Sequence, residues 1–289
     1  MAEPVTVPPG PVLAVTRLAA RVPGVRRGLF YAVAWLLAGL LLGFVVLPLV
    51  RLVLATSPTQ LAAAVRTADI RAAVWLSLQD AAITAVVAAF LGIPLAWLLA
   101  RGHVPGRYFL QGVVDLPLAV PHSVVGIGLL FVLGRRGWVG APAGHIDLSF
   151  YGTQAGIVAG MLFVSAPFMV DSVRQAIESI DPRLEQAARS LGAGPWLTFS
   201  RVTLPLAARG VFAGLALTYA RSISEFGAVA ILAYFPMTAP VKVYDLYLQA
   251  GLQQSASAAV LLLLVTLSTF VVFRALAAQQ VEYRDGRDG

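Results

Sequence analysis

Long stretches of uncharged apolar residues constrain this fold more than any other feature of the sequence. The first, residues 29–50, contains no charged side chain. As an α-helix it would reach about 33 Å, enough to cross a bilayer core of roughly 30 Å. Charged residues make up 12% of the 289 residues, against about 25% in an average soluble domain. The sequence therefore predicts spans at about 29–50, 74–100, 108–134, 153–170, 207–233 and 256–275, the second of them broken by Gly92 and Pro94.

We predict an all-α integral membrane protein, because these runs are continuous and lack the ten-residue alternation of a membrane barrel. Six transmembrane helices place both ends of the chain on one side. With the N-terminus inside, 14 arginines fall in cytoplasmic segments and 6 basic residues in outer ones, which favours cytoplasmic ends in the inner or plasma membrane. The expected parts are a cytoplasmic segment at 1–28, a six-span domain at 29–275 and a cytoplasmic tail at 276–289. Residues 60–71 are expected to form a short amphipathic helix on the outer surface.

The connection between the fourth and fifth spans, residues 171–206, is the longest cytoplasmic segment. Asp181 can cap a helix that begins at Pro182, because aspartate accepts backbone N–H groups and proline suits the first helical position. Apolar residues then repeat at helical spacing until Gly192 ends the helix, and Pro195 opens a second short helix. One interpretation is a connector that packs on its own bundle. The other is a docking element for a cytosolic partner.

The same loop resembles the EAA loop of ABC-importer permease subunits, whose pattern is Glu-Ala-Ala, three residues, Gly, nine residues and Ile-x-Leu-Pro. Gln186 stands where the family has its glutamate, and Glu185 lies one place earlier. The resemblance implies a type I ABC importer permease fold with two copies of this chain, two ATPase subunits on the 171–206 loop, and an extracytoplasmic binding protein on the outer loops. The residues implied in ATPase coupling are Glu185, Gln186, Ala187, Ala188, Gly192, Leu204 and Pro205.

Two charged residues lie well inside the fifth predicted span, away from its ends. Arg221 and Glu225 are four residues apart, so a continuous helix would place them side by side. Charges at membrane depth cost several kcal/mol unless they are paired or wet. One interpretation is an ion pair that only pins neighbouring helices. The other is a wall of a substrate pathway, where two copies of Arg221 attract an anion and Glu225 limits how tightly it binds.

The third span contains Pro117 and Pro121 and is expected to be a kinked helix, either lining the same pathway or bent only for packing. Residues 115–128, 221–228 and 234–245 are similar to the permease subunit of molybdate/tungstate importers, with sulfate/thiosulfate permeases as close relatives. The resemblance implies an oxyanion substrate. The implied pathway residues are Pro121, His122, Ser123, Arg221, Ser224 and Glu225.

No sequence motif for using ATP is found in this chain. A phosphate-binding loop of the form G-x-x-x-x-G-K-[ST] needs a lysine, and the only lysine, Lys242, lies in an outer segment. The three histidines lack metal-ligand spacing. We therefore expect no catalytic residue, metal or cofactor in this chain, with ATP and Mg bound by the partner ATPase, and no binding of nucleic acid. The alternatives are an ATP-independent secondary transporter or channel, and a non-transporting scaffold.

Overall fold

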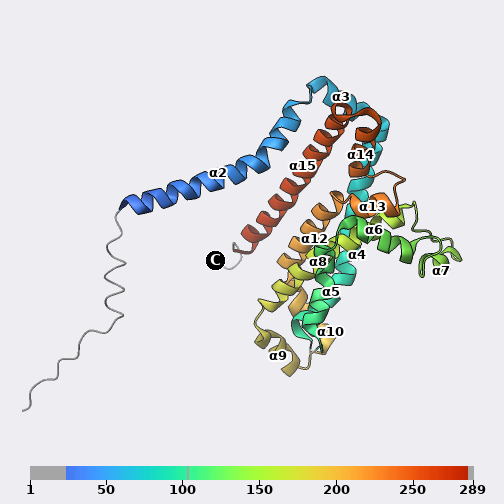
Figure 1. Cartoon of the computed structure of the whole chain (residues 1–289). Helices are drawn as coiled ribbons and strands as arrows, with labels where there is room; N and C mark the ends of the chain where they lie inside the picture. The colour runs from blue at the N-terminus through green and yellow to red at the C-terminus, as the bar shows by residue number, and fades with distance from the viewer. Residues whose placement is uncertain (1–23, 103, 286–289) are drawn as a thin grey trace, which may run out of the picture. The chain divides into compact units, whose positions relative to one another are not determined.

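The computed structural model describes residues 24–102 and 104–285, and every regular element in these ranges is a helix (Figure 1). The chain divides into two compact units, the first ending at Ala55 and the second beginning at Thr56. Predictions for residues 1–23, for His103 and for residues 286–289 lie outside the described residues. The expected all-α membrane fold is confirmed.

The described part of the first unit is one long helix, α2 (Gly24–Leu54). Its apolar part, Phe30–Leu54, is long enough to cross a membrane and has no buried residue. A helix that is apolar on all sides and uncovered by its own chain needs lipid or another chain around it. The first predicted span is therefore confirmed.

The second unit opens with α3 (Pro58–Arg66) and α4 (Ala68–Arg101). The short helix predicted at 60–71 is α3, which begins with a capping box at Ser57 and ends earlier because Thr67 has an extended backbone. The predicted break at Gly92 and Pro94 is wrong, since α4 continues through both. Gly92 packs closely against α8, where a Cβ would lie 3.1 Å from Met169 Cγ, and packed membrane helices tolerate an internal proline.

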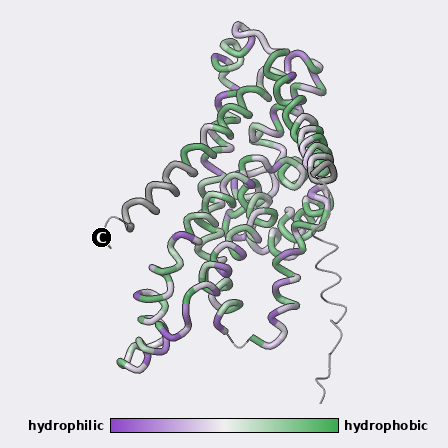
Figure 2. The backbone as a smooth tube through the Cα atoms, turned by 90° about the vertical axis from the view of Figure 1, so that its left-hand side faces the viewer, coloured by the Kyte–Doolittle hydropathy of each residue, from purple (hydrophilic) through white to green (hydrophobic). Residues whose placement is uncertain are grey.

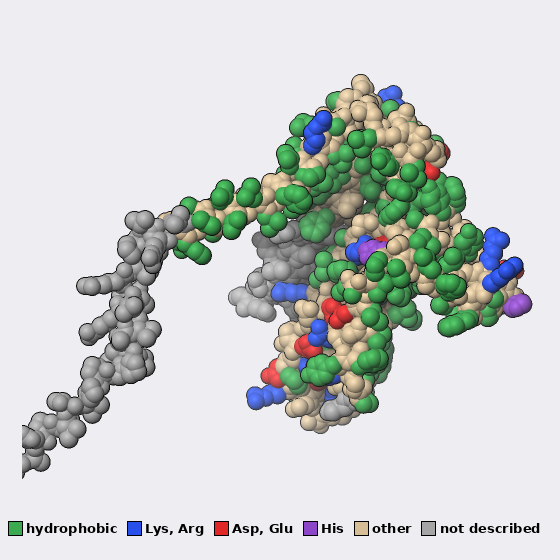
Figure 3. Space-filling view, viewed as in Figure 1, with side chains coloured by type: hydrophobic (Ala, Val, Ile, Leu, Met, Phe, Trp, Pro, Cys, Tyr) green, Lys and Arg blue, Asp and Glu red, His purple; other side chains and the backbone are tan. Residues whose placement is uncertain are grey.

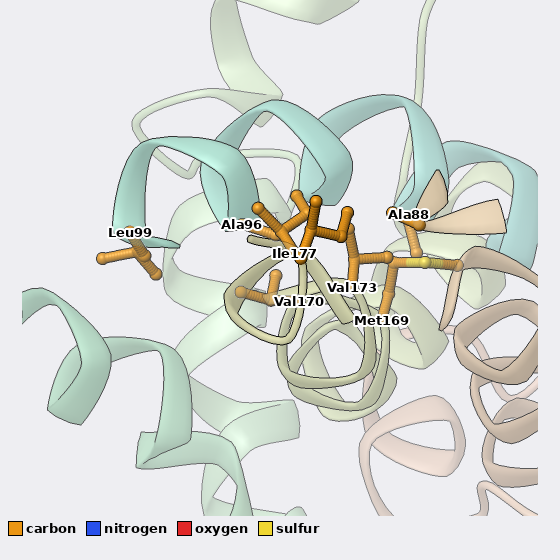
Figure 4. Packing of buried hydrophobic residues seen from close by; sticks show 9 residues of the cluster. Ala88, Ala96, Leu99, Met169, Val170, Val173 and Ile177 are labelled. Carbon is orange, nitrogen blue, oxygen red and sulfur yellow. The ribbon is translucent and has the colours of Figure 1, made fainter. Parts of the chain in front are cut away.

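Helices α4, α8 (Gln154–Glu178) and α12 (Ala208–Ile223) form the centre of the second unit. Glycines allow close approach: a Cβ at Gly210 would overlap Ala176, and one at Gly214 would lie 2.9 Å from Met169 Sδ. Small residues of this kind let membrane helices pack backbone to backbone. The labelled side chains of the resulting core, shown in Figure 4, are Ala88, Ala96, Leu99, Met169, Val170, Val173 and Ile177.

Two of the predicted spans are broken. Helices α5 (Arg107–Ala119) and α6 (His122–Leu133) meet at 113°, so the third span is two helices and not one kinked helix. The predicted fifth span is interrupted after α12 and resumes as α13 (Gly227–Leu232). A second bent pair is Pro195–Leu206 with Ala208–Ile223, which meet at 69°. Four described helices are long and apolar enough to cross a membrane. If each bent pair counts as one span, the total is six.

Outside the 171–206 segment, the other described helices are α7 (Gly140–Gly144), α14 (Ala239–Ala250) and α15 (Leu252–Asp285). The sequence did not predict α14, which lies in an expected loop. Hydrophobic residues follow the long helices in Figure 2. Hydrophilic residues gather at the lower end of that view, where α9 (Pro182–Ser190) and α10 (Pro195–Thr198) lie in Figure 1. This end of the second unit therefore suits water and not lipid.

Candidate functional sites

An ionic cluster lies where the two broken spans meet. Arg221 Nη2 donates a hydrogen bond to Glu225 Oε2 at 2.8 Å and lies within 3.1 Å of both ring nitrogens of His122. His122 Nδ1 lies 3.3 Å from the same carboxylate oxygen. The structure thus joins three predicted residues, one of them 99 residues distant from Arg221 along the chain.

The contact between Arg221 and Glu225 does not arise in the way the sequence suggested. Helix α12 ends at Ile223, so the two residues are not neighbours on one helical face. Instead, Glu225 Oε1 accepts a hydrogen bond from the Ala228 N–H at 2.9 Å, which satisfies a free N–H group at the start of α13. The other oxygen is left for Arg221. One buried carboxylate therefore caps a helix and anchors a cation at the same time.

The three side chains of this cluster differ in solvent exposure. The Glu225 side chain is 1% exposed, whereas those of Arg221 and His122 are 21% and 39% exposed. A solute can therefore reach the arginine and the histidine but not the carboxylate. Ser224, which is exposed, lies with its Oγ 3.4 Å from Arg221 Nη1. Figure 3 shows a histidine beside charged side chains near the middle of the visible face.

The two other predicted pathway residues, Pro121 and Ser123, are exposed at the start of α6. Pro121 is the N-cap residue of that helix, and its Val120 neighbour is extended, which makes the sharp corner. Gly227 allows α13 to approach this corner, since a Cβ there would lie 2.8 Å from His122 Cβ. The corner therefore presents the histidine to Arg221.

Gly126 is expected to be intolerant of alanine, because an added Cβ would lie 2.9 Å from Ile231 Cβ and 3.1 Å from the Ala228 carbonyl oxygen. Overpacking of this kind costs about 1–3 kcal/mol. Gly128 in the same helix has no atom within 4 Å of the corresponding position, so Gly128→Ala is the matched control. We expect Gly126→Ala to lower the thermal unfolding temperature of the solubilised protein by several degrees. Equal midpoints for the two variants would contradict this packing argument.

The 171–206 segment has the two helices that the sequence predicted, although α8 continues through its first eight residues to Glu178. The Asp181 side chain accepts a hydrogen bond from the Arg183 N–H and caps α9, as expected. Gly192 has a positive φ of 89° and ends this helix region. The second helix is α10, followed by a π-helical turn, Phe199–Thr203, and by α11 (Leu204–Leu206).

Glu185 is a buried carboxylate in this loop and ties the loop to the end of α4. Its Oε1 lies 3.2 Å from Arg101 Nε and accepts a hydrogen bond from Thr203 Oγ1 at 2.8 Å. Arg101 also donates to the Ile180 carbonyl oxygen at 2.6 Å. We call Arg101, Glu185 and Thr203 the loop clamp. It connects α4 to α9 and to the π-helical turn.

Part of the surface of this loop is not covered by the rest of the described chain. Leu191 and Trp196 are 90% and 75% exposed. Such large apolar side chains grouped in a hydrophilic region are typical of a protein interaction surface. Of the predicted coupling residues, Gln186, Ala187, Gly192 and Pro205 are exposed, Ala188 and Leu204 are half-buried, and Glu185 is buried.

A third region of interest runs from residue 234 into α14. The Tyr234 hydroxyl donates a hydrogen bond to Asp245 Oδ1 at 3.1 Å, and Ser77 Oγ accepts one from the Ala239 N–H at 2.7 Å. Burial raises the pKa of the Tyr234 hydroxyl, and the hydrogen bond to Asp245 raises it further, so the hydroxyl stays a donor. The Phe235–Pro236 peptide bond is cis. The two hydrogen bonds connect the predicted loop to α14 and α14 to α4.

Residues 92–281 match the family described as the binding-protein-dependent transport system inner membrane component. The chain belongs to this family. It is 39% identical over 204 residues to the molybdate/tungstate transport system permease protein WtpB of Thermococcus kodakarensis, covering 71% of this chain and 77% of that protein. A probable molybdenum ABC transporter permease protein of Haloferax volcanii is 37% identical over 93% of this chain and 96% of its own.

Solved transporters share the fold. A bacterial ABC transporter that imports the acidic polysaccharide alginate has a TM-score of 0.72 at 20% identity, covering 88% of this chain and 96% of that one. The type I importer permease fold expected from the resemblance is therefore confirmed for this member of the family.

Two residues of the loop clamp, Arg101 and Thr203, were missed in the sequence. Arg101 was counted only as a cytoplasmic positive charge, and Thr203 occupies the variable position of the family's Ile-x-Leu-Pro pattern. No signal in the sequence separates Arg101 from the other arginines beside spans. The sequence pattern did not show which of Glu185 and Gln186 is the structurally important one. In the structure Glu185 is buried and Gln186 is exposed.

Proposed function

We propose that this protein is the permease subunit of an ATP-driven importer of molybdate or tungstate. The observation that carries the proposal is the identity of 37–39% to relatives named as molybdate or molybdate/tungstate permeases. The exposed part of the ionic cluster agrees with a tetrahedral oxyanion substrate, because Arg221 and His122 are accessible and the opposing carboxylate is not. Preorganised donors and cations of this kind bind anions in a pathway.

In the proposed complex, two copies of this chain form the pathway, two ATPase subunits bind the 171–206 loops, and an extracytoplasmic binding protein delivers the anion to the outer loops. Both termini lie in the cytoplasm, in agreement with the arginine bias. ATP and Mg are bound by the ATPase subunits, which close on ATP. The clamped loop moves as a stiff element and carries this movement into α4, which supports alternating access by rigid-body motion.

Copurification from gentle detergent tests the complex. An ATPase subunit recovered at equal stoichiometry, and ATP-dependent uptake of radiolabelled molybdate by vesicles that contain the complex and the binding protein, are the expected results. Recovery of the chain alone, with uptake driven by an ion gradient, would support a secondary transporter instead. Recovery of the ATPase without any uptake would support a scaffold.

Substrate choice needs a separate measurement. Molybdate, tungstate and sulfate are all tetrahedral divalent oxyanions, so the cluster alone does not discriminate among them. We expect unlabelled tungstate to compete with labelled molybdate at far lower concentration than sulfate does. Stronger competition by sulfate would replace the proposed substrate with that of the related sulfate permeases.

Gly192 offers a test of coupling with a nearby control. A valine there is strained by the φ of 89°, at a cost of roughly 1–2 kcal/mol, although its Cβ would meet no atom within 4 Å. Gly194 has the same open surroundings but an ordinary φ of −66°. We expect Gly192→Val to reduce ATP-driven uptake several-fold at an unchanged membrane level, and Gly194→Val to reduce it less. Unchanged uptake in Gly192→Val would argue against a coupling role for this turn.

A further inference from the structure

A second group of charged residues lies between α5 and α8, apart from the Arg221 cluster. Six side chains alternate across the contact between the two helices. We call them the ionic seam: Arg107, Gln111 and Asp115 on α5, and Asp171, Arg174 and Glu178 on α8. Neither the sequence motifs nor the proposed function assigns them a role.

The seam is a continuous chain of polar contacts. Gln111 Nε2 donates to both carboxylates beside it, to Asp171 Oδ1 at 2.8 Å and to Asp115 Oδ2 at 3.2 Å. Arg174 pairs with Asp171 at 3.3 Å and with Glu178 at 3.0 Å. Arg107 Nη2 lies 4.0 Å from Glu178. The Gln111 amide and the Arg107–Glu178 pair therefore connect α5 to α8 across the seam.

Part of the seam lies at membrane depth. Asp171 is about 26 Å along α8 from Gln154, at 1.5 Å per residue. With Gln154 at the outer edge of a bilayer core of roughly 30 Å, Asp171 lies just inside the inner edge of that core. Charged side chains at such depth face the interior of a bundle or a water-filled cavity, and not lipid.

The chain itself does not cover these side chains. Asp171 and Arg174 are 26% and 22% exposed. Figure 3 shows red and blue side chains below the central histidine on the same face of the molecule. Solute can therefore reach the seam from the surface of the second unit.

The charges of the two groups differ. Around Arg221 one guanidinium opposes one carboxylate that is out of reach of solute, whereas the seam has three carboxylates and two guanidinium groups, all partly exposed. A surface with an excess of one sign of charge concentrates ions of opposite sign and repels like ones. The seam thus favours cations and disfavours an oxyanion.

We propose that the ionic seam lines a water-filled vestibule at the inner end of the pathway, and that its excess of carboxylate promotes release of the transported oxyanion. The proposal rests on the proposed function for the identity of the solute and for the direction of transport. The solvent accessibility of the vestibule and its charge can both be measured without a transport assay.

The absence of cysteine from the chain makes thiol labelling a direct test. Leu118 follows Gln111 and Asp115 by seven and three residues and shares their helical face, whereas Leu116 lies on the opposite face. The two leucines are similarly exposed, at 56% and 51%. Leu118→Cys and Leu116→Cys are therefore matched reporters, to be studied in the complete complex in lipid nanodiscs.

Each reporter is treated with a cationic and an anionic methanethiosulfonate reagent. We expect Leu118→Cys to react at least tenfold faster than Leu116→Cys, and several-fold faster with the cationic reagent than with the anionic one. Adding Asp115→Asn, which keeps the size of the side chain, should bring the ratio of the two rates toward one. Asp171→Asn should act in the same direction. Equal labelling rates at the two positions would overturn the vestibule proposal. So would a ratio of cationic to anionic labelling rates that neither substitution changes.

Uptake by the cysteine-free variants tests release. Asp115→Asn and Asp171→Asn are expected to lower the maximal rate of molybdate uptake several-fold with little change in KM, because entry through the outer side is unaffected. Asp147→Asn, which removes an exposed carboxylate from the α7 region, is the control. Wild-type rates in both seam variants would overturn the release role. A wild-type complex that imports no oxyanion would overturn the proposed function and leave the labelling result standing.

Discussion

Glu185→Ala is expected to abolish most ATP-driven uptake and to destabilise the 171–206 loop. The substitution removes the partner of Arg101 and the acceptor of Thr203 in one step. Loss of one partner from a buried ion pair costs about 3–5 kcal/mol, because the remaining charge stays buried and unpaired. The loop would then no longer move together with α4.

The neighbouring Gln186 provides the control for this prediction. Gln186 is exposed, although it occupies the position of the family's glutamate, and Gln186→Ala should keep uptake within about twofold of wild type, as for most surface substitutions. Uptake, ATPase stoichiometry on copurification and protease sensitivity of the loop are to be measured for both variants. A larger loss in Gln186→Ala than in Glu185→Ala would mean that contact with the ATPase, and not the loop clamp, governs coupling.

The pattern of apolar runs was sufficient to predict the membrane helices, but not their ends. Helix α8 was expected to stop at residue 170, before the first charged residue, yet it continues to Glu178. Its charged turns are stabilised by pairs within α8 and with α5. Contacts between helices that are distant in sequence cannot be read from local hydropathy, so the boundary was misplaced.

The break between α12 and α13 shows a similar limit. Prolines marked the corner before α6, but no proline or glycine pair marks Ser224–Phe226. The chain turns there because Glu225 caps α13 and because Gly227 admits the backbone of His122. The members of the site were predicted from motifs, whereas the contact of His122 with Arg221 depends on two such corners that meet in space.

Arg221→Ala is expected to reduce uptake at least tenfold. The substitution removes the accessible cation, and it leaves the 1% exposed carboxylate of Glu225 with His122 and the Ala228 N–H as its remaining partners. Arg209→Ala, at an exposed site on the same helix, should keep most of the uptake. A rate for Arg221→Ala equal to that of wild type would remove this residue from the pathway.

A double variant separates the two interpretations of the pair. If Arg221 only neutralises a buried charge, the double variant Arg221→Ala/Glu225→Gln should restore uptake, because it removes both charges while the amide oxygen can still accept the Ala228 N–H. If Arg221 attracts the oxyanion, the double variant should regain assembly with the ATPase but not uptake. We expect the second result, since the arginine remains reachable by solute while its carboxylate partner does not. Arg221→Lys, which keeps the charge but loses the paired N–H groups, should then retain more uptake than the double variant.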